Sequence, residues 1–380
     1  MKLLKIINLI FIISLLSNCS MFNRTHDEIR GVWLTNVDSE VLGSRESIAE
    51  AMQFLADHHF NIVFPVVWND AVTMYPSRVM DNLFNVAIDL RYRGRDPLAE
   101  LIEEAHKHDI KVIAWFEYGF SASYNKNGGK ILGQRKEWAA RDRDGNLLTK
   151  NGFEWMNAYH PDVQEFMLSL VQEVVENYDI DGVQGDDRLP AQPIEGGYSD
   201  YTRFLYLATH QGASVPEDPR DSLWQRWRAD RLNSFAKKMY TTVKILKPDI
   251  IVSWAPSIYP WSYDEYLQDW PTWIRDGYAD LVIPQNYRYN FEEYMKTLDD
   301  MVPGKAVLSS NDCIIVPGIL LKVGDYTIDE DYLINAIAYN RKSGYKGEVF
   351  FFYEGLCDNQ NALAKRLMET VYKDRAALPF

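Results

Sequence analysis

Cysteine is scarce in this sequence, which limits both its disulfide and its metal chemistry. Only Cys19, Cys313 and Cys357 are present, too few for a disulfide-based scaffold. Cys313 and Cys357 follow predicted neighbouring strands, so a bridge between them is geometrically possible, but we favour two buried free thiols. Among the seven histidines only His106 and His108 have His-x-His spacing, and we expect both to lie on the surface of a predicted helix; there is no His-Glu-x-x-His motif and no cysteine pair has zinc spacing. We therefore predict no metal site.

Other signatures of common enzyme classes are also missing. There is no Gly-x-Ser-x-Gly elbow for a serine nucleophile and no glycine loop for phosphate. Basic residues are outnumbered, with 40 Lys and Arg against 54 Asp and Glu and a net charge of -14. This balance argues against nucleic acid or an anionic membrane surface as a partner and favours a neutral or weakly charged substrate. No cofactor is predicted.

Long apolar runs are absent except at the N-terminus. Lys2 and Lys5 precede an apolar run over residues 6–16, which is typical of a signal peptide and too short to span a bilayer. The run ends in Leu-Ser-Asn-Cys, which resembles a bacterial lipobox. We therefore expect residues 1–19 to be a lipoprotein signal and Cys19 to be lipidated, which would anchor the exported protein to a membrane of the cell envelope. Plain secretion is the alternative.

Short apolar segments alternate with amphipathic ones from residue 28 onward. This alternation predicts an α/β fold, a single (β/α)8 TIM barrel over residues 28–372 with long loops at its C-terminal face. The predicted strands are residues 31–36, 61–68, 111–117, 182–187, 250–254, 281–287, 306–309 and 348–353. The predicted helices include residues 45–58, 97–108, 161–178, 222–246 and 332–343.

Two predicted loops, residues 119–155 and 188–220, are long enough to suggest a functional role. Residues 141–146 in the first loop have a faint resemblance to a calcium-binding loop. An Asp-Gly hairpin turn at Asp144 and Gly145 is the preferred interpretation.

The fourth predicted strand ends in adjacent carboxylates, Asp186 and Asp187. Side chains alternate along a strand, so Gln184 and Asp186 share one face, and the apolar Val183 faces the helices. We therefore expect Asp186 to point into the barrel mouth and Asp187 to lie at the rim. Adjacent carboxylates are costly unless they are hydrogen-bonded, metal-bound or used in proton transfer. A capping or salt-bridging pair is the alternative.

Two more carboxylates end predicted strands at the same rim, Glu117 on the third strand and Glu354 on the eighth. A glycosidase needs two carboxyl groups flanking the scissile bond, about 5 Å apart for retention or about 6.5 to 9.5 Å apart for inversion. Either glutamate could be the general acid if its pKa is raised by an aromatic surround. The alternative is that one of them only holds a loop or a substrate hydroxyl.

Amides and aromatic rings cluster at the predicted strand ends, a combination that suits sugar binding. For any single tryptophan, core packing is the more common role, so the prediction depends on the whole set. The predicted substrate-binding residues are Trp33, Asn36, Trp68, Asn69, Asn157, Trp254, Gln285 and Tyr287.

Five segments together resemble the bacterial glycosyl-hydrolase-like 10 family. They are residues 30–36, 74–77, 155–161, 181–187 and 283–287, and they occur in the order typical of that family. The resemblance implies a (β/α)8 barrel, frequent export with a lipoprotein signal, and hydrolysis of glycosidic bonds. It also implies cleavage of peptidoglycan glycan strands, including strands without stem peptides.

This chain departs from the family pattern around the paired aspartates. It has Gly185 where a bulky apolar residue is common and Arg188 where an aromatic one is common. Glu117 matches only one branch of the family. Related barrel glycosidases often carry an acid after strand six, where this chain has Gln285 and Asn286.

Our leading hypothesis from the sequence is an envelope glycosidase that acts on peptidoglycan glycan. Asp186 would be the main catalytic carboxylate, supported by Asp187, with Glu354 or Glu117 as the acid. A hydrolase of another polysaccharide and a non-catalytic glycan-binding lipoprotein are the alternatives. The sequence does not predict an oligomeric state.

Overall fold

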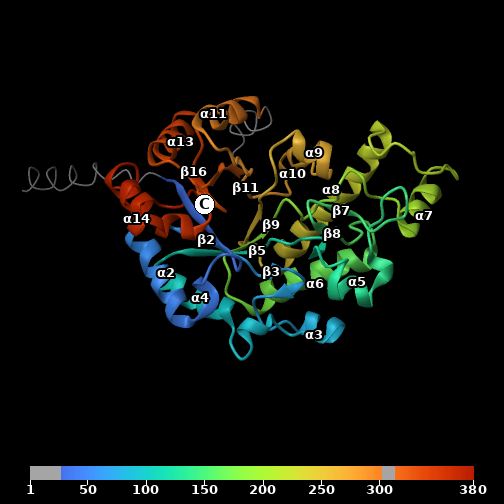
Figure 1. The fold of residues 1–380 in the computed structure, drawn as a ribbon, viewed down its shortest axis with the longest axis horizontal. Helices are drawn as coiled ribbons and strands as arrows, with labels where there is room; N and C mark the ends of the chain where they lie inside the picture. The colour runs from blue at the N-terminus through green and yellow to red at the C-terminus, as the bar shows by residue number, and fades with distance from the viewer. Residues whose placement is uncertain (1–26, 302–312) are drawn as a thin grey trace, which may run out of the picture.

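The computed structural model describes residues 27–301 and 313–380. The predicted leader with Cys19 and the strand predicted at residues 306–309 lie outside the described residues. At the centre is a curled, nine-stranded parallel sheet with the order β12-β11-β10-β9-β5-β2-β1-β16-β13 (Figure 1). Its strands are β1 (Ile29–Leu34), β2 (Ile62–Pro65), β5 (Lys111–Phe116), β9 (Gly182–Gly185), β10 (Ile251–Trp254), β11 (Leu281–Val282), β12 (Ile314–Ile315), β13 (Gly318–Leu320) and β16 (Gly347–Phe351).

The two ends of this sheet are joined by a short piece of chain. β12 pairs with β11 and β13 pairs with β16, yet only Val316 and Pro317 separate them. The Gly318 amide also donates to the Pro284 carbonyl at 2.9 Å, and the Asn286 amide donates to the Gly318 carbonyl at 3.1 Å. The sheet therefore curls round until its two edges meet.

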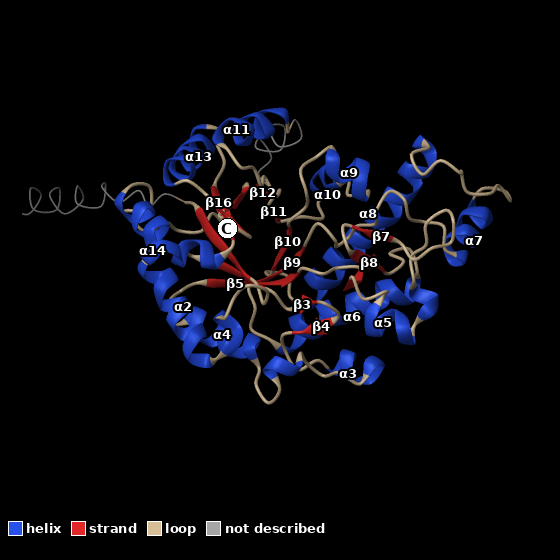
Figure 2. Cartoon of the chain, viewed as in Figure 1, coloured by secondary structure: helices blue, strands red, loops and turns tan. Residues whose placement is uncertain are grey.

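Helices surround the curled sheet (Figure 2). The first turn of α4 carries the expected cap: Asp96 accepts a hydrogen bond from the Ala99 amide, and Pro97 occupies a position that needs no amide donor. None of the described helices is both long and apolar enough to cross a membrane. The main ones are α2 (Arg45–Asp57), α4 (Pro97–His106), α6 (Pro161–Asn177), α8 (Ser222–Leu246), α10 (Trp270–Arg275), α11 (Phe291–Asp300), α13 (Glu330–Lys342) and α14 (Tyr353–Glu369).

The five predicted helices are confirmed, with boundaries within a few residues of those expected. Seven of the eight predicted strands also coincide with observed ones, although several end earlier. Shorter strands and helices lie in the connections between the main elements. They are β3 (Trp68–Asn69), β4 (Val72–Thr73), α3 (Arg78–Phe84), α9 (Trp261–Tyr266), β14 (Lys322–Val323) and β15 (Tyr326–Thr327).

Both predicted long loops contain regular structure. The loop after β5 holds α5 (Gly129–Gln134) and a small antiparallel sheet of β6 (Ser121–Tyr124), β8 (Phe153–Trp155) and β7 (Thr149–Lys150), and the loop after β9 holds α7 (Asp200–Thr209). Residues 141–146 form the predicted hairpin turn, because the Asp142 amide bonds to the Asn146 carbonyl and Gly145 has a φ of +86°. The residues that the structure describes contain no cluster of three or more potential metal ligands.

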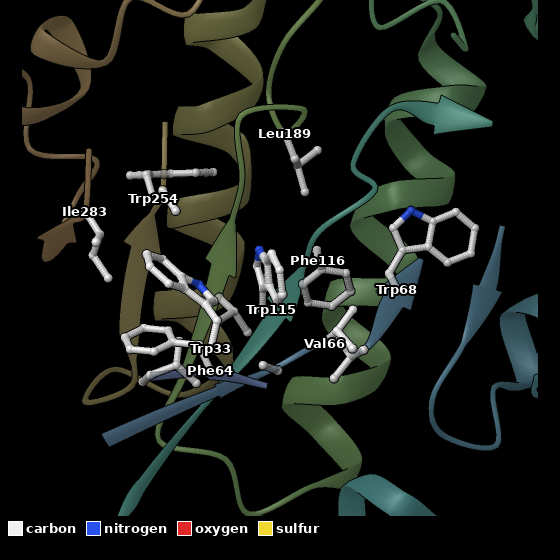
Figure 3. Close-up of a cluster of buried hydrophobic side chains, with 14 of the residues drawn as sticks. Trp33, Phe64, Val66, Trp68, Trp115, Phe116, Leu189, Trp254 and Ile283 are labelled. Carbon is white, nitrogen blue, oxygen red and sulfur yellow. The ribbon is translucent and has the colours of Figure 1, made fainter. Parts of the chain in front are cut away.

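Three tryptophans predicted at the rim are instead part of the core, so this prediction is wrong. Trp33, Trp68 and Trp254 are at most 1% exposed (Figure 3). The Trp33 indole donates to the Gln184 side chain at 2.7 Å inside the sheet, Trp68 packs edge-on against Phe166 of α6, and Trp254 packs against Trp273 of α10. These tryptophans are buried because the space inside the curled sheet and between the sheet and its helices must be filled by large side chains to reach close packing.

At the amino ends of β1 and β16 lies a buried polar group that we call the base cluster: Glu28, Arg30, Arg341, Glu348 and Tyr372. Glu28 accepts hydrogen bonds from Arg30 at 2.9 Å and from Arg341 at 2.7 Å. The Tyr372 hydroxyl donates to Glu348 at 2.7 Å. These contacts hold the C-terminal segment against the bottom of the sheet.

The two remaining cysteines are not bridged. Cys313 is buried just before β12, and Cys357 is half-buried in α14. The preferred prediction of two free thiols is confirmed.

Candidate active site

The alternation predicted for the fourth strand is confirmed at the end of β9. Gln184 is fully buried within the sheet, where its amide donates to the Ser253 hydroxyl at 2.8 Å. Asp186 is 3% exposed, whereas 26% of the Asp187 side chain is exposed. Asp186 therefore faces inward and Asp187 lies nearer the solvent.

Asp186 is held by neighbouring amides. Its Oδ1 accepts hydrogen bonds from Gln285 Nε2 at 2.5 Å and from the Asp187 backbone amide at 2.7 Å. Its carbonyl oxygen accepts a hydrogen bond from Gln268 Nε2 at 2.9 Å. Burial, reinforced by the negative charge of Asp187, raises the pKa of Asp186 well above its ordinary value, although Arg188 opposes the shift. Asp186 is thus suited to carrying a proton.

Glu117 follows β5 and joins the same group from the neighbouring strand. Its side chain accepts a hydrogen bond from Asn69 Nδ2 on β3 and lies 3.5 Å from Arg188 Nη2. Burial raises the pKa of Glu117, while Arg188 and the Asn69 hydrogen bond lower it. The predicted positions of Glu117 and Asn69 at the same rim are therefore confirmed.

One cation lies among three carboxylates. Arg188 Nη1 is 3.1 Å from Asp187 Oδ1, Nη2 is 3.4 Å from Asp186 Oδ2, and Nε donates to the Glu117 carbonyl at 3.1 Å. The guanidinium also lies over the Phe153 ring, 4.5 Å from its centroid. We call Glu117, Asp186, Asp187 and Arg188 the mouth cluster. From the sequence, Arg188 was only a departure from the family pattern, although several acids converging on one rim indicate a need for a cation among them.

Two phenols flank the mouth cluster. Burial, with the charges of Asp186, Asp187 and Glu117, raises the pKa of Tyr287 well above its ordinary value. Burial and then the charge of Asp187 raise the pKa of Tyr266 to about 12. Both hydroxyls therefore keep their protons and can donate hydrogen bonds next to the carboxylates. Tyr287 was predicted, whereas Tyr266 belongs to α9 and no pattern in the sequence pointed to it.

Glu354 lies apart from the mouth cluster. It is the second residue of α14 and lines a pocket of about 530 Å³ together with Asn36, Ser39 and Arg91. Burial raises the pKa of Glu354 to about 7. No contact among the described residues joins it to Glu117, Asp186 or Asp187. Of the two candidate acids, the structure therefore brings only Glu117 to the paired aspartates.

Asn157 has a structural role instead of the predicted contact with substrate. It is buried, its side-chain amide donates to the Thr202 hydroxyl at 3.0 Å, and its side-chain oxygen accepts from the Tyr159 amide at 3.1 Å. These bonds fasten the long loop after β5 to α7. These contacts use the polar groups of Asn157 within the protein and argue against the predicted contact with substrate.

The fold of this chain resembles that of several solved structures. The glycoside hydrolase domain of PgaB (BpsB) from Bordetella bronchiseptica superposes with a TM-score of 0.63 at 17% identity, covering 89% of this chain and 98% of that domain. The catalytic domain of a β-amylase from Paenibacillus polymyxa gives a TM-score of 0.63 at 11% identity, covering 92% and 99%. At these identities the likeness concerns the fold alone.

Proteins with a similar sequence include two that are named glycosyl hydrolases. Glycosyl hydrolase DigH of Escherichia coli K12 is 24% identical over 291 residues, which is 68% of this chain and 62% of that protein. Glycosyl hydrolase YngK of Bacillus subtilis is 26% identical over 297 residues, which is 68% of this chain and 54% of that protein. The chain thus spans between half and two thirds of the length of these relatives. The model of the family described as "Glycosyl hydrolase-like 10" matches residues 28–329, so the chain belongs to this family.

Proposed function

We propose that this protein hydrolyses glycosidic bonds in peptidoglycan glycan strands, and that the mouth cluster is its catalytic centre. The observation that carries the proposal is the convergence of Glu117 and the Asp186-Asp187 pair, from the ends of adjacent strands, on one half-buried arginine, Arg188. Active sites of parallel barrels are built at the carboxyl ends of the strands. Family membership supports the reaction class.

The different environments of the carboxyl groups suggest a division of roles. In glycoside hydrolysis a carboxylic acid protonates the leaving oxygen while a carboxylate attacks the sugar carbon or removes a proton from water. Asp186 and Glu117 have raised pKa values and are suited to donate the proton. Asp187 is more exposed and is paired with Arg188, so we assign it the role of carboxylate. This reverses the order expected from the sequence, in which Asp186 was the main carboxylate.

The choice of peptidoglycan depends on observations outside the mouth cluster. The resemblance of the five segments, the predicted export signal and the acidic net charge together favour a glycan of the envelope with little charge of its own. We likewise propose that Cys19 is lipidated and that the protein is anchored in the envelope. Labelling cells with a clickable fatty acid checks this, since a Cys19→Ser variant should lose the label.

We also propose that the sheet is an eight-stranded barrel. In this interpretation β12 and β13 are two halves of the seventh strand, interrupted at Val316 and Pro317. Proline has no amide hydrogen to donate to the neighbouring strand, which is consistent with an interruption there.

The test is hydrolysis by Asp186→Asn and Asp187→Asn variants on intact sacculi and on glycan strands stripped of stem peptides. Loss of an acid or base typically lowers kcat by about 10² to 10⁴-fold. Asp144→Asn is the matched control, because Asp144 is exposed in the hairpin turn of the long loop. Folding is checked by circular dichroism. Wild-type rates in both site variants would contradict the assignment.

Two other functions remain as alternatives. Hydrolysis of another polysaccharide would appear when the protein is screened against an exopolysaccharide and a storage α-glucan. A non-catalytic glycan-binding role is favoured by one observation, the contact of Arg188 with all three carboxylates, since such neutralisation can preserve a binding site without turnover. Binding to sacculi without soluble product would support that role.

A further inference from the structure

We propose that four aromatic residues next to the mouth cluster, Tyr124, Phe153, Tyr266 and Trp261, form an aromatic wall that holds several sugar units of a polymer. The inference rests on the proposed function and deepens it, because it predicts a substrate that extends well beyond the bond to be cut. Trp261 and Tyr124 are the exposed ends of this wall.

Trp261 supplies one end. It is the first residue of α9, it is 49% exposed, and its ring centroid lies 5.4 Å from that of Tyr266. A single exposed tryptophan on a surface needs no special explanation. This one is notable because its partner Tyr266 is almost buried and adjoins the mouth cluster.

Three hydrogen bonds hold Tyr266 and the end of α9 beside the paired aspartates. Gln268, two residues after Tyr266, donates to the Asp186 carbonyl at 2.9 Å. The Gln192 amide donates to the Tyr266 carbonyl at 3.1 Å, and Asn151 donates to the Tyr266 hydroxyl at 3.1 Å. These hydrogen bonds tie the end of α9, and with it the helix that carries Trp261, to the segment of the paired aspartates.

Tyr124 supplies the other end. Arg188 lies over the Phe153 ring, and the Phe153 ring centroid is 5.1 Å from that of Tyr124, which is 47% exposed. The Tyr124 ring also covers Gly152, where an added Cβ would lie 2.5 Å from it. Gly152 therefore leaves the space that the ring occupies.

The polar groups along the wall favour the binding of a neutral sugar unit over an anionic one. Lys150 lies 5.0 Å from the Tyr266 ring centroid, but its charge is matched by Glu265 at 2.7 Å and Glu195 at 3.1 Å. Flat aromatic faces provide large rigid contact areas for the apolar faces of sugars, and the neighbouring amides and hydroxyls can take the sugar hydroxyls. Because Trp261 and Tyr124 are each separated from the mouth cluster by another ring, we expect a chain that contacts all three to contain several units.

The experiment compares binding and cleavage of short and long glycan strands stripped of stem peptides. The strands contain two, six or twelve sugar units. The variants are Trp261→Ala, Tyr124→Ala and Trp261→Phe, with Phe204→Ala as control, because Phe204 is an exposed aromatic residue on α7. Binding is measured by calorimetry with the full chain, and KM and kcat are measured on the same strands.

We expect Trp261→Ala to weaken binding of the twelve-unit strand about tenfold, a loss of about 1.4 kcal/mol. Binding of the two-unit strand and kcat should change little. Trp261→Phe should restore most of the affinity, Tyr124→Ala should give a smaller loss of the same kind, and Phe204→Ala should match the wild type. Equal binding of short and long strands by the wild type, or wild-type binding by both alanine variants, would overturn the proposal.

These outcomes are separable from failure of the proposed function. Length-dependent binding that requires Trp261, without any hydrolysis, would support the aromatic wall and reject catalysis. Hydrolysis that requires Asp187 but is indifferent to Trp261 and Tyr124 would support catalysis and reject the wall. No binding of any strand by the wild type would overturn the wall.

Discussion

The two ends of the curled sheet each bury a group of carboxylates and arginines, yet the two groups differ in charge balance and closure. The base cluster has two arginines for two glutamates, and the C-terminal segment covers it. The mouth cluster has one arginine for three carboxylates, and Asp187 remains partly exposed. A balanced, covered group is suited to stability, whereas an acid-rich, open one is suited to proton transfer.

A raised pKa alone does not distinguish the two ends. Burial raises the pKa of Glu348 in the base cluster to about 7, and burial also raises that of Asp186 in the mouth cluster. Glu354, which belongs to neither cluster, has a pKa raised to about 7 as well. The grouping of several acids around a partly open arginine is therefore the better sign of an active site.

The largest effect is expected from a substitution that disrupts the base cluster. Arg30 is buried, donates to Glu28 and to the Asp374 carbonyl, and lies 4.2 Å from the Tyr372 ring centroid. We expect Arg30→Met to lower the free energy of unfolding by about 3 to 5 kcal/mol, because it leaves a buried carboxylate without one of its partners. Denaturant titration measures this effect.

The exposed Arg375→Met is the matched control and should change stability by less than about 0.5 kcal/mol. Hydrolysis per folded molecule should be unchanged in both variants. A stable Arg30→Met protein that has lost hydrolysis would contradict the assignment of the base cluster to stability.

Arg188→Gln tests the mouth cluster. Arg188 lowers the pKa values of both Asp186 and Glu117, so its removal should raise them. The limb of the pH–rate profile that reports these groups should move upward by about 1 to 3 pH units. The profile of kcat/KM for wild type and variant measures the shift. An unchanged profile would mean that neither acid controls the rate.

Glu348→Gln tests the pH dependence of the base cluster. An unfolded glutamate ionises near 4.5, whereas folded Glu348 keeps its proton until about pH 7, so unfolding releases a proton between these values. This contribution to stability is full below pH 4.5 and is lost as the pH rises through about 7. Between pH 4.5 and 8 the free energy of unfolding should fall in both proteins, but it should fall by about 1 to 3 kcal/mol less in the variant than in the wild type.

The measurement is denaturant titration at several pH values. Glutamine keeps an oxygen that can accept the Tyr372 hydrogen bond, so the variant is expected to fold. Parallel stability curves for the two proteins would show that Glu348 does not titrate in this range.

The smallest effect is expected for Glu354→Gln. Because Glu354 does not contact the mouth cluster, kcat/KM should stay within about threefold of the wild type. Loss of a general acid would instead cost about 10² to 10⁴-fold. Assays on glycan strands at several pH values decide between Glu354 and the pair of Asp186 and Glu117 as the proton donor.

The sequence predicted the sheet, the main helices and the inward direction of Asp186, because alternation and capping are local properties. It could not separate rim from interior for Trp33, Trp68 and Trp254, since a strand pattern shows which face a residue is on but not how deep it lies. The strand predicted at residues 306–309 stays a prediction.

The misjudged residues of the candidate site share one cause. Arg188, Tyr266 and Glu354 each depend on how a segment outside the strands folds back on the sheet. Such returns are set by contacts between residues far apart in sequence. Asn69, Gln285 and Tyr287 lie near the carboxylates, as expected from their positions at or just beyond strand ends, whereas the same distance from a strand end did not bring Glu354 there, because Glu354 lies in the first turn of α14.

The glycine before the paired aspartates couples two positions that are distant in sequence. An added Cβ at Gly185 would lie 2.4 Å from the Leu189 carbonyl and 2.6 Å from the Trp254 ring. A homologue with a bulky residue at this place must therefore carry a smaller one opposite it on β10, or bend the chain after the aspartates differently. We therefore expect the sizes of these two residues to covary: in an alignment of homologues, a large residue at one position should accompany a small residue at the other.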